Sequence, residues 1–434
     1  MIFYSTNHQS PDVSLEEAVF RGLPSDNGLY MPKIIPNLPT SFFENIDKMS
    51  ITDIAFEVSK ALLSDDISDS DLKMIVERAI DFDAPLVEIE ENTHVLELFH
   101  GPSMAFKDFG ARFMASLMSY FLQKSQKDIH ILVATSGDTG GAVAQGFYKT
   151  PGIKVTILYP TGKVSDIQEK QLTTLGENVT ALEVDGTFDD CQALVKTAFL
   201  DEDLSSKFNL ASANSINISR LIPQSFYYFH AFAELKRKGN TKPVVFCVPS
   251  GNFGNLSAGL IAQRMGLPVK MFVAATNANN AVPEYLKTGN YSSKTSQETI
   301  SNAMDVGNPS NFIRMRLLAG DAHEQVVTHI TGDFSNDSDT RKAMKKVYDR
   351  TGYVMCPHTA VAYLGLKSYT ETLNEEVAGV VLSTAHYAKF LDVVEDTLET
   401  KVDVPERLLA LLTKQKVSIP MNKEFTDFKK YLLS

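Results

Sequence analysis

The sequence predicts an α/β protein with two lobes, each built on a parallel sheet, behind a mostly helical N-terminal domain. Short apolar runs that suit buried strands alternate with helix-like stretches. The alternation falls into two groups, at about 125–210 and 240–400, and the first 95 residues lack it. Such alternation favours right-handed βαβ units whose helices cover both faces of a parallel sheet.

The N-terminal domain is predicted to be a packing module. A short helix is expected over 15–22, where Gly22 ends it, followed by extended chain over 28–32. Apolar residues recur at helical spacing over 52–63 and 70–79, with Ser, Thr or Asp near each start. No acid–base or metal-binding group of residues stands out in this region, so we assign no chemistry to it.

The two α/β groups supply the remaining predicted elements. Strands are expected at the apolar runs 129–134, 153–159, 179–184, 243–248, 269–274 and 377–382. Helices are expected at 188–199, at 226–235 and after Ser165-Asp166. The polar stretches 288–298 and 332–339 are expected to be loops.

Composition narrows the class of protein. The chain has 434 residues, 44% hydrophobic and 22% charged, which suits a globular protein of two or three domains. Its formal net charge of −12 leaves no basic excess to neutralise nucleic-acid phosphates. The three cysteines are far apart and match no metal-binding spacing, so reduced thiols are expected. With no signal peptide or membrane-spanning run apparent, we predict a cytoplasmic protein that binds neither membranes nor nucleic acid.

One lysine, Lys107, stands in an unusual setting. The run from His100 to Gly110 contains a Gly-Pro turn and places Lys107 between Phe106 and Phe109. Partial desolvation there would favour the neutral amine that a covalent lysine requires. A surface lysine whose stem covers apolar neighbours is the alternative, and the stretch alone leaves that alternative ahead.

Two glycine-rich loops follow predicted strands, at 135–143 and 249–259. Small residues let backbone N–H groups converge on an anion, and the following helix presents its positive end to the same point. Neither loop matches the P-loop or the dinucleotide fingerprint. A tight turn explains either loop alone, whereas two such loops in one α/β chain favour ligand binding.

Two further stretches carry polar groups. Thr384, in the loop after the last clear strand, could present its hydroxyl to a ring nitrogen, whereas the nearby His386 is more simply structural. Amide, hydroxyl and guanidinium groups gather within 214–220, and the Arg220 fork suits a phosphate or carboxylate. A capped helix start with a surface arginine is the alternative for this segment.

Together these stretches resemble the threonine synthase family, pyridoxal-phosphate enzymes of the tryptophan synthase β-like group (fold type II). The resemblance runs nearly end to end and includes the segments 4–6, 21–23, 28–30, 100–110, 212–220, 301–307 and 357–362 and both glycine-rich loops. It implies an N-terminal domain over 1–95, the extension of the longer class. It further implies a small lobe over 96–210 that contains the cofactor lysine, and a large lobe over 211–434 that contains the cofactor phosphate loop.

The resemblance also implies roles for individual residues. Lys107 corresponds to the lysine that holds pyridoxal 5'-phosphate and moves protons, and Thr384 to the hydroxyl facing the pyridine nitrogen. The loop that holds the cofactor phosphate corresponds to Gly251, Asn252, Phe253, Gly254 and Asn255. The substrate-binding groups correspond to Ser136, Gly137 and Thr139 near the carboxylate and to Asn214, Ser215 and Arg220 around the phosphate.

Three positions depart from the pattern of relatives. Asp138, expected near the cofactor ring oxygen, stands where many relatives in the wider fold have asparagine. Tyr387 replaces a proline and is expected to alter the loop that carries Thr384. Cys356 replaces an acidic residue and is expected to change surface chemistry.

The implied reaction converts O-phospho-L-homoserine and water to L-threonine and phosphate. A phospho-lyase or dehydratase of the same fold, which releases 2-oxobutanoate, is the nearest alternative, and a non-catalytic relative that binds the cofactor is another. No metal is implied. The long class suggests a monomer, with a dimer as the alternative.

Overall fold

The computed structural model describes residues 1–125 and 128–434, and these form two compact units. The first unit comprises Met1, 33–106 and 221–403, and the second comprises 2–32, 107–220 and 404–434. Each unit therefore combines segments that are distant along the chain. The predicted division into three consecutive domains stays a prediction.

The first unit contains most of the helices. They are α2 (Thr40–Asn45), α3 (Ile51–Leu63), α4 (Asp69–Ala79), α11 (Phe226–Arg237), α12 (Gly254–Arg264), α13 (Ala281–Thr288), α14 (Phe312–Leu318), α15 (His323–His329), α16 (Asp337–Thr351), α17 (Pro357–Thr370) and α18 (Leu391–Leu398). Short 3₁₀ segments are η1 (Ile46–Lys48), η2 (Ile222–Ser225), η3 (Asn302–Met304) and η4 (Tyr387–Phe390). Its strands are β4 (Leu86–Glu90), β5 (Thr93–Glu97), β10 (Val244–Pro249), β11 (Val269–Thr276), β12 (Ile330–Phe334) and β13 (Ala378–Ser383).

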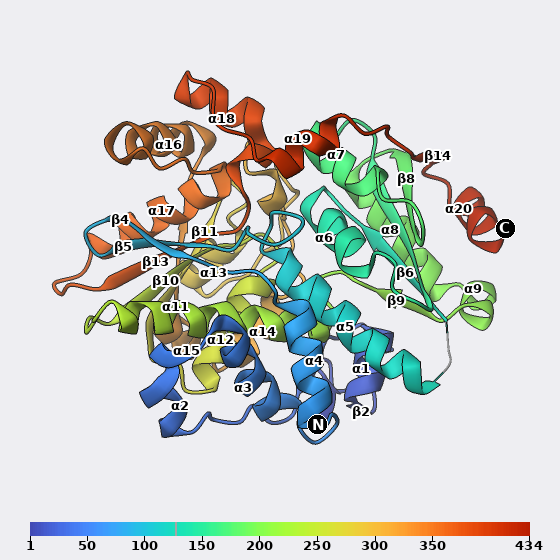
Figure 1. The fold of residues 1–434 in the computed structure, drawn as a ribbon, viewed down its shortest axis with the longest axis horizontal. Coiled ribbons are helices and arrows are strands. Elements are labelled where there is room, and N and C mark those ends of the chain that lie inside the picture. The colour runs from blue at the N-terminus through green and yellow to red at the C-terminus, as the bar shows by residue number, and fades with distance from the viewer. Residues whose placement is uncertain (126–127) are drawn as a thin grey trace. The chain divides into compact units, whose positions relative to one another are not determined.

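These strands form one mixed sheet in the order β12-β11-β10-β13-β5-β4, with β4 antiparallel to β5 and the other pairs parallel. Helix α17 packs against β10, β11 and β13, and Figure 1 shows α11 and α12 below the sheet and α16 and α17 above it. The pairing of β10 with β13 positions two of the candidate loops. The two strands are parallel, and Cys247 near the end of β10 lies opposite Val381 near the end of β13. The loops after these strands, which carry Gly251 and Thr384, therefore leave the same edge of the sheet side by side.

The second unit is built on a parallel sheet. Its helices are α1 (Leu15–Arg21), α5 (Lys107–Ser125), α6 (Asp138–Phe147), α7 (Asp166–Thr173), α8 (Phe188–Leu200), α9 (Glu202–Lys207), α19 (Glu406–Leu412) and α20 (Phe425–Leu433), and α10 (Ile218–Leu221) ends at the boundary between units. The strands β6 (Ile129–Ala134), β7 (Ile153–Pro160), β8 (Val179–Asp185), β9 (Leu210–Ser212) and β14 (Ile419–Asn422) pair in the order β14-β8-β7-β6-β9. A small antiparallel sheet adds β1 (Ile2–Ser5), β2 (Val13–Ser14) and β3 (Tyr30–Pro32).

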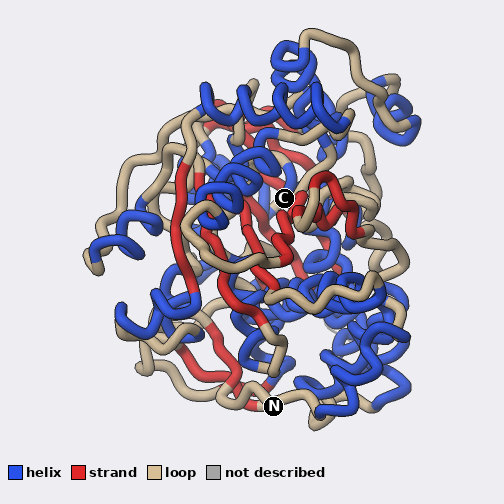
Figure 2. The backbone as a smooth tube through the Cα atoms, turned by 90° about the vertical axis from the view of Figure 1, so that its left-hand side faces the viewer, coloured by secondary structure: helices blue, strands red, loops and turns tan. Residues whose placement is uncertain are grey.

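Strands β6 and β9 position the functional loops of this unit. They are parallel, with Leu132 opposite Ser212, so the loops that begin at Thr135 and Ala213 leave the same edge. Helices α6 and α8 pack against β7 and β6, and Leu132, Leu158 and Leu182 form part of the buried core. Figure 2 draws the strands in red and the helices in blue.

The predicted α/β class with parallel sheets is confirmed, and each predicted strand and helix is present with small shifts at its ends. One loop prediction is wrong, because 332–339 contains the end of β12 and the start of α16. The polar residues there form a helix start: the Asn336 side chain accepts a hydrogen bond from the backbone N–H of Asp339 at 2.9 Å. Among the described residues, no helix has both the length and the apolar character needed to cross a bilayer.

Candidate active site

Lys107 is the first residue of α5, and its ammonium has a defined partner. Its Nζ atom donates a hydrogen bond to the hydroxyl of Thr139 at 2.8 Å. The side chain is half-buried, and Met104 and Phe109 nearby in sequence are 2% and 0% exposed. A surface lysine whose stem covers apolar neighbours, the alternative that the sequence left open, does not by itself account for this hydrogen bond.

The loop from Thr135 to Thr139 is organised by side chains as well as by glycine. The Thr135 hydroxyl accepts hydrogen bonds from the N–H groups of Gly137 (2.9 Å) and Gly140 (2.8 Å). At the start of α6, Asp138 is buried, and its carboxylate accepts a hydrogen bond from the Gln168 amide at 2.9 Å. The structure thus gives Asp138 a protein partner, which the sequence did not indicate.

We expect Gly137→Ala to destabilise this loop. Gly137 has φ +134°, which side chains of L-residues rarely adopt, and an added Cβ would lie 2.5 Å from Cδ of Gln168. Strain and clash together should lower the free energy of unfolding by more than about 2 kcal/mol, measured by urea denaturation. Gly162→Ala is the matched control, because Gly162 also has positive φ but nothing within 4 Å of the added carbon. If the free energy of unfolding fell equally in the two variants, the clash with Gln168 would make no contribution and the prediction would be wrong.

The segment 213–220 places a buried cation beside polar groups of the second unit. Arg220 is 2% exposed and donates from Nη1 to the carbonyl of Ala213 at 2.5 Å. Burial lowers the pKa of its guanidinium to about 10, and the carboxylate of Asp108 opposes that shift. The Oδ1 atom of Asn214 is buried and accepts no hydrogen bond from the described residues. A buried acceptor of this kind calls for a donor from a ligand or a water.

Asn217 organises this segment and was missed by the sequence interpretation. It is fully buried, its Nδ2 donates to the carbonyl of Val19 at 2.9 Å, and its Oδ1 accepts from the Ser219 N–H and hydroxyl. Asn217 therefore ties the loop after β9 to α1. The only sequence signal was an asparagine two residues before a serine, as in many Asx turns.

Gly110 allows α5 to approach the same segment closely. It lies one turn after Lys107, and a Cβ at this position would come within 2.8 Å of the carbonyl oxygen of Arg220. A bare backbone is therefore needed where the lysine-bearing helix meets the arginine-bearing segment of the second unit.

In the first unit, the loop after β10 has the conformation of an anion-binding turn. Phe253 adopts the left-handed conformation with φ 60° immediately before α12, whose N-terminus begins at Gly254. Successive N–H groups in such a turn, together with the helix dipole, favour a bound anion. Asn255 braces the loop, because its Nδ2 donates to the carbonyl of Pro249 at 2.8 Å. Gly251 packs so closely against 303–304 that a Cβ would lie 2.8 Å from Cα of Met304.

Thr384 follows β13 and is held by its backbone, which leaves its side chain available. Its carbonyl accepts a hydrogen bond from the N–H of Phe106 at 2.8 Å, and the His386 N–H donates to Met104 at 3.1 Å. The residue is 6% exposed, and its hydroxyl makes no hydrogen bond to any described residue. Lys107 directly follows Phe106 in the chain, so the residue that pairs with Thr384 is the one immediately before the lysine.

His386 and two of the positions that depart from the family pattern, Tyr387 and Cys356, make defined contacts. His386 is structural, as expected: its ring accepts a hydrogen bond from the Ala388 N–H at 3.1 Å and begins η4. The Tyr387 hydroxyl donates to the carbonyl of Asp403 at 3.0 Å, beside the end of this unit. The expectation that Cys356 alters surface chemistry is wrong, because Cys356 is 1% exposed and its sulfur lies 3.3 Å from the Thr359 hydroxyl.

A buried carboxylate, Asp305, fixes the segment that packs on Gly251. It accepts hydrogen bonds from the Asn277 amide at 2.8 Å and from the Thr299 hydroxyl at 2.7 Å. Burial raises the pKa of Asp305 to about 6, hydrogen bonds from Thr299 and Asn277 oppose the shift, and the carboxylate of Asp337 adds to it. The group should therefore titrate in a mildly acidic range.

We expect Asp305→Asn to remove a pH-dependent part of the stability. The carboxyl pKa is raised from 3.8 to about 6 on folding, so its contribution is complete below about pH 4 and lost as pH rises through about 6. The melting temperature of the parent relative to the variant should accordingly fall between about pH 4 and 6 and stay level above about pH 7. Thermal unfolding of both proteins across this range checks the prediction. A difference that does not vary with pH would contradict it.

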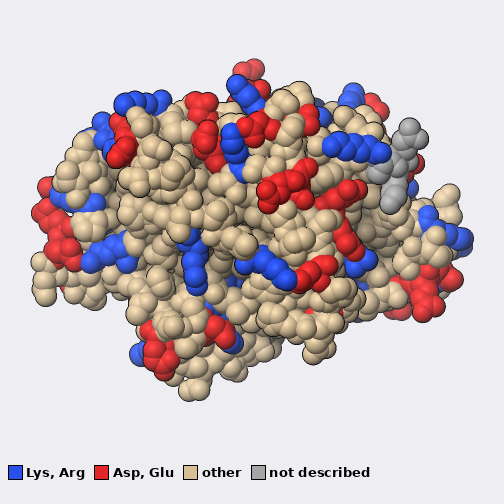
Figure 3. Space-filling view, turned by 90° about the horizontal axis from the view of Figure 1, so that it is seen from below, with Lys and Arg blue, Asp and Glu red and all other residues tan. Residues whose placement is uncertain are grey.

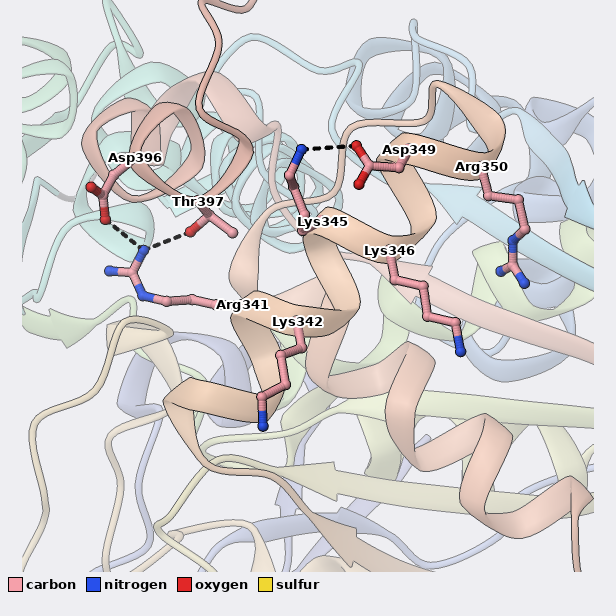
Figure 4. A pocket seen from close by; sticks show the side chains of 8 residues that line it. All are labelled: Arg341, Lys342, Lys345, Lys346, Asp349, Arg350, Asp396 and Thr397. Atoms are coloured by element: carbon pink, nitrogen blue, oxygen red, sulfur yellow. Dashed lines mark hydrogen bonds and ion pairs between the residues drawn. The ribbon is translucent and has the colours of Figure 1, made fainter.

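Surface charge does not mark the site. Charges of both signs are mixed on the face drawn in Figure 3. An open pocket of about 750 Å³ lies along α16 and α18 (Figure 4), lined by Arg341, Lys342, Lys345, Lys346, Asp349, Arg350, Asp396 and Thr397. Acids neutralise most of its cations, as Asp396 does for Arg341 at 2.9 Å. It contains none of the residues predicted for the site.

Comparison with known proteins agrees with this geometry. The family model for pyridoxal-phosphate-dependent enzymes matches residues 84–384, and the models for the threonine synthase N terminus and C-terminal region match 2–80 and 359–432. A threonine synthase from Haemophilus influenzae is 43% identical over 433 residues, covering 100% of both chains. The chain belongs to the threonine synthase family.

Solved structures of threonine synthases have the same fold as this chain. A crystal structure of threonine synthase from Escherichia coli superposes with a TM-score of 0.92 at 41% identity, covering 100% of this chain and 99% of the other. A threonine synthase from Brucella melitensis, solved with pyridoxal phosphate bound, has the same TM-score at 33% identity and covers 100% and 98% of the two chains. A threonine deaminase from Solanum lycopersicum, at 18% identity and a TM-score of 0.57, shares the fold alone.

Family membership makes the chain a pyridoxal-phosphate-dependent lyase, with pyridoxal phosphate as its cofactor. Its own residues suit that group. The turn at Phe253 offers backbone donors to a phosphate, and the Thr384 hydroxyl, which lacks a protein partner among the described residues, can meet a ring nitrogen. The amine of Lys107 is held at a defined point by Thr139.

Proposed function

We propose that the chain converts O-phospho-L-homoserine and water to L-threonine and inorganic phosphate. The observation that carries this proposal is Lys107 at the start of α5, hydrogen-bonded to Thr139 at 2.8 Å, in a chain that matches threonine synthases over its full length. When bound, the cofactor supplies the electron sink for proton removal next to the substrate amine. The protein supplies binding, orientation and proton transfer.

Lys107 would hold the cofactor covalently and would move protons at Cα and Cβ of the substrate. Gly251, Asn252, Phe253, Gly254 and Asn255 would hold the cofactor phosphate through backbone N–H groups. The hydroxyl of Thr384 would bind the pyridine nitrogen, and Asp138 would bind near the ring oxygen. The hydrogen bond that Asp138 accepts from Gln168 supports an orienting part for this carboxylate.

The substrate contacts come from two adjacent strand ends of the second unit. Ser136, Gly137 and Thr139, after β6, bind the carboxylate. Asn214, Ser215 and Arg220, after β9, bind the phosphate. The pairing of β6 with β9 supports this assignment, because it sets the two loops side by side. A guanidinium favours departure of the phosphate dianion, since its forked donors match phosphate oxygens.

In the overall balance, phosphate leaves Cγ, the oxygen of water adds at Cβ, and protons return to Cγ and Cα. A hydroxyl partner such as Thr384 leaves a pyridine nitrogen largely unprotonated, which weakens the electron sink. Stabilisation of the leaving phosphate by Arg220 then carries more of the catalysis.

Product analysis tests the proposal. The purified protein, incubated with O-phospho-L-homoserine, should release threonine and phosphate in equal amounts. Release of 2-oxobutanoate and ammonia in place of threonine would identify a phospho-lyase, and absence of both would indicate a non-catalytic relative. A cytoplasmic location and a monomeric state are further parts of the proposal, and light scattering of the purified protein checks the second.

A further inference from the structure

The peptide between Asn252 and Phe253 is held by residues outside its own loop. The carbonyl oxygen of Asn252 accepts a hydrogen bond from Nδ2 of Asn311 at 3.0 Å. The side-chain oxygen of Asn252 accepts another from the backbone N–H of Ser310 at 2.5 Å. Two consecutive residues immediately before α14, Ser310 and Asn311, thus bind one residue of the glycine-rich loop within a single unit.

Arg314 fixes the orientation of the Asn311 amide. Its Nη1 donates to Oδ1 of Asn311 at 2.9 Å, and both residues are 0% exposed. A guanidinium has donors and no acceptor, so it faces the oxygen end of the amide. The nitrogen end of Asn311 must then point to the carbonyl of Asn252.

Fixing that carbonyl also fixes the neighbouring N–H. In a trans peptide the C=O and N–H bonds point in opposite directions, and no cis peptide is present among the described residues. With the Asn252 carbonyl turned toward Asn311, the N–H of Phe253 must point away from α14.

The alternative peptide orientation is intrinsically favourable for the backbone. Phe253 has φ 60°, a region that bulky residues rarely occupy. A half-turn of the peptide would move φ into the negative region and relieve this strain. It would also turn the Phe253 N–H to the side now occupied by the carbonyl. The observed orientation of this peptide therefore depends on hydrogen bonds from residues outside the loop.

We propose that Asn311 and Arg314 are positioning residues for the cofactor: they hold the Asn252–Phe253 peptide so that the Phe253 N–H faces the cofactor phosphate. This inference rests on the proposed function, which assigns the cofactor phosphate to 251–255. We assign neither residue a direct contact with the cofactor. Asn311 acts through Asn252, and Arg314 acts through Asn311.

The substitution Asn311→Asp removes the hydrogen bond to the Asn252 carbonyl without changing the size of the side chain. Aspartate has the same shape and keeps a bond to Arg314, but it replaces the amide donor with an oxygen. In the holoenzyme, the rate of cofactor release after dilution, followed by absorbance, should rise about tenfold or more. The ³¹P resonance of the bound cofactor should also move toward that of the free cofactor, a change that a general loss of stability does not produce.

Two further variants separate the amide donor from other effects. Asn311→Ala removes the same donor without adding a negative charge, so it should share both changes. Arg316→Gln is the matched control, because Arg316 lies in the same helix but pairs with Asp321 at the surface. It should release cofactor at the parent rate. Arg314→Lys, which retains a donor, should release cofactor more slowly than Arg314→Met.

Parent-like release and an unshifted ³¹P resonance in both Asn311 variants would overturn the proposal. An effect in Asn311→Asp but not in Asn311→Ala would assign the change to charge repulsion, and would also overturn it. A parent protein that binds no pyridoxal phosphate would instead sink the assignment of the phosphate loop, so failures of the two proposals are distinguishable.

Discussion

Lys107→Ala is expected to lower kcat by at least about 10³-fold and to remove the covalently held cofactor. The same amine is proposed to anchor the cofactor and to transfer protons, and losing a positioned acid–base group alone lowers rates by about 10²–10⁴-fold. The hydrogen bond from Lys107 to Thr139 shows that the amine is held at one point. Single-turnover kinetics and borohydride reduction followed by peptide mass spectrometry measure the two effects.

Lys124→Ala is the matched control for this prediction. Lys124 lies in the same helix, one residue before its end, and is exposed. Its replacement should leave activity and borohydride labelling unchanged. A reducible chromophore that persists in Lys107→Ala would assign the covalent bond to another lysine.

Arg220→Ala is expected to lower kcat/KM for O-phospho-L-homoserine by about 10²–10³-fold, since charge-assisted hydrogen bonds to a phosphate dianion are lost. Retention of the cofactor should change little, because Arg220 is assigned to the substrate and not to the cofactor. Steady-state kinetics with the phosphorylated substrate and cofactor release after dilution measure these quantities separately.

The burial of Arg220 calls for a second variant. Removing a buried cation leaves the nearby carboxylate of Asp108 less compensated, which can destabilise the fold. Arg220→Lys keeps the charge but lacks the forked donors, so we expect an intermediate loss of kcat/KM with a melting temperature near that of the parent. Loss of cofactor with unchanged turnover per bound cofactor in Arg220→Ala would contradict the substrate assignment.

Much of the fold could be predicted because parallel sheets leave a simple sequence pattern. The runs at 129–134 and 244–249 are apolar except for His130, and every residue in them is buried, since both faces of their sheets are covered. The pattern failed at 332–339, where Asn336 and the acidic residues after it cap α16. Polar residues at a helix start have the same composition as a loop, and only the backbone hydrogen bonds distinguish them.

The candidate site likewise contains some residues that the sequence predicts and others that only the structure reveals. Lys107, Arg220 and the loop 251–255 could be named from the sequence because each stands in a short stretch of distinctive chemistry. Asn311 and Arg314 could not, because their function depends on Asn252, which lies 59 residues before Asn311. The burial of Cys356 was missed for a related reason, since a single residue carries no sign of the helix packing around it.

The sequence by itself determined which chemical groups this protein brings to its site: an amine, two glycine-rich loops, a hydroxyl and a guanidinium. It also determined the order of strands and helices along the chain, because local hydrophobic spacing is enough for that. Only the tertiary structure decided which strands are neighbours, and hence that Thr384 and Gly251 leave one sheet edge and that Thr135 and Ala213 leave another. It alone decided how the Asn252–Phe253 peptide is turned, because that orientation depends on hydrogen bonds between residues far apart in the sequence.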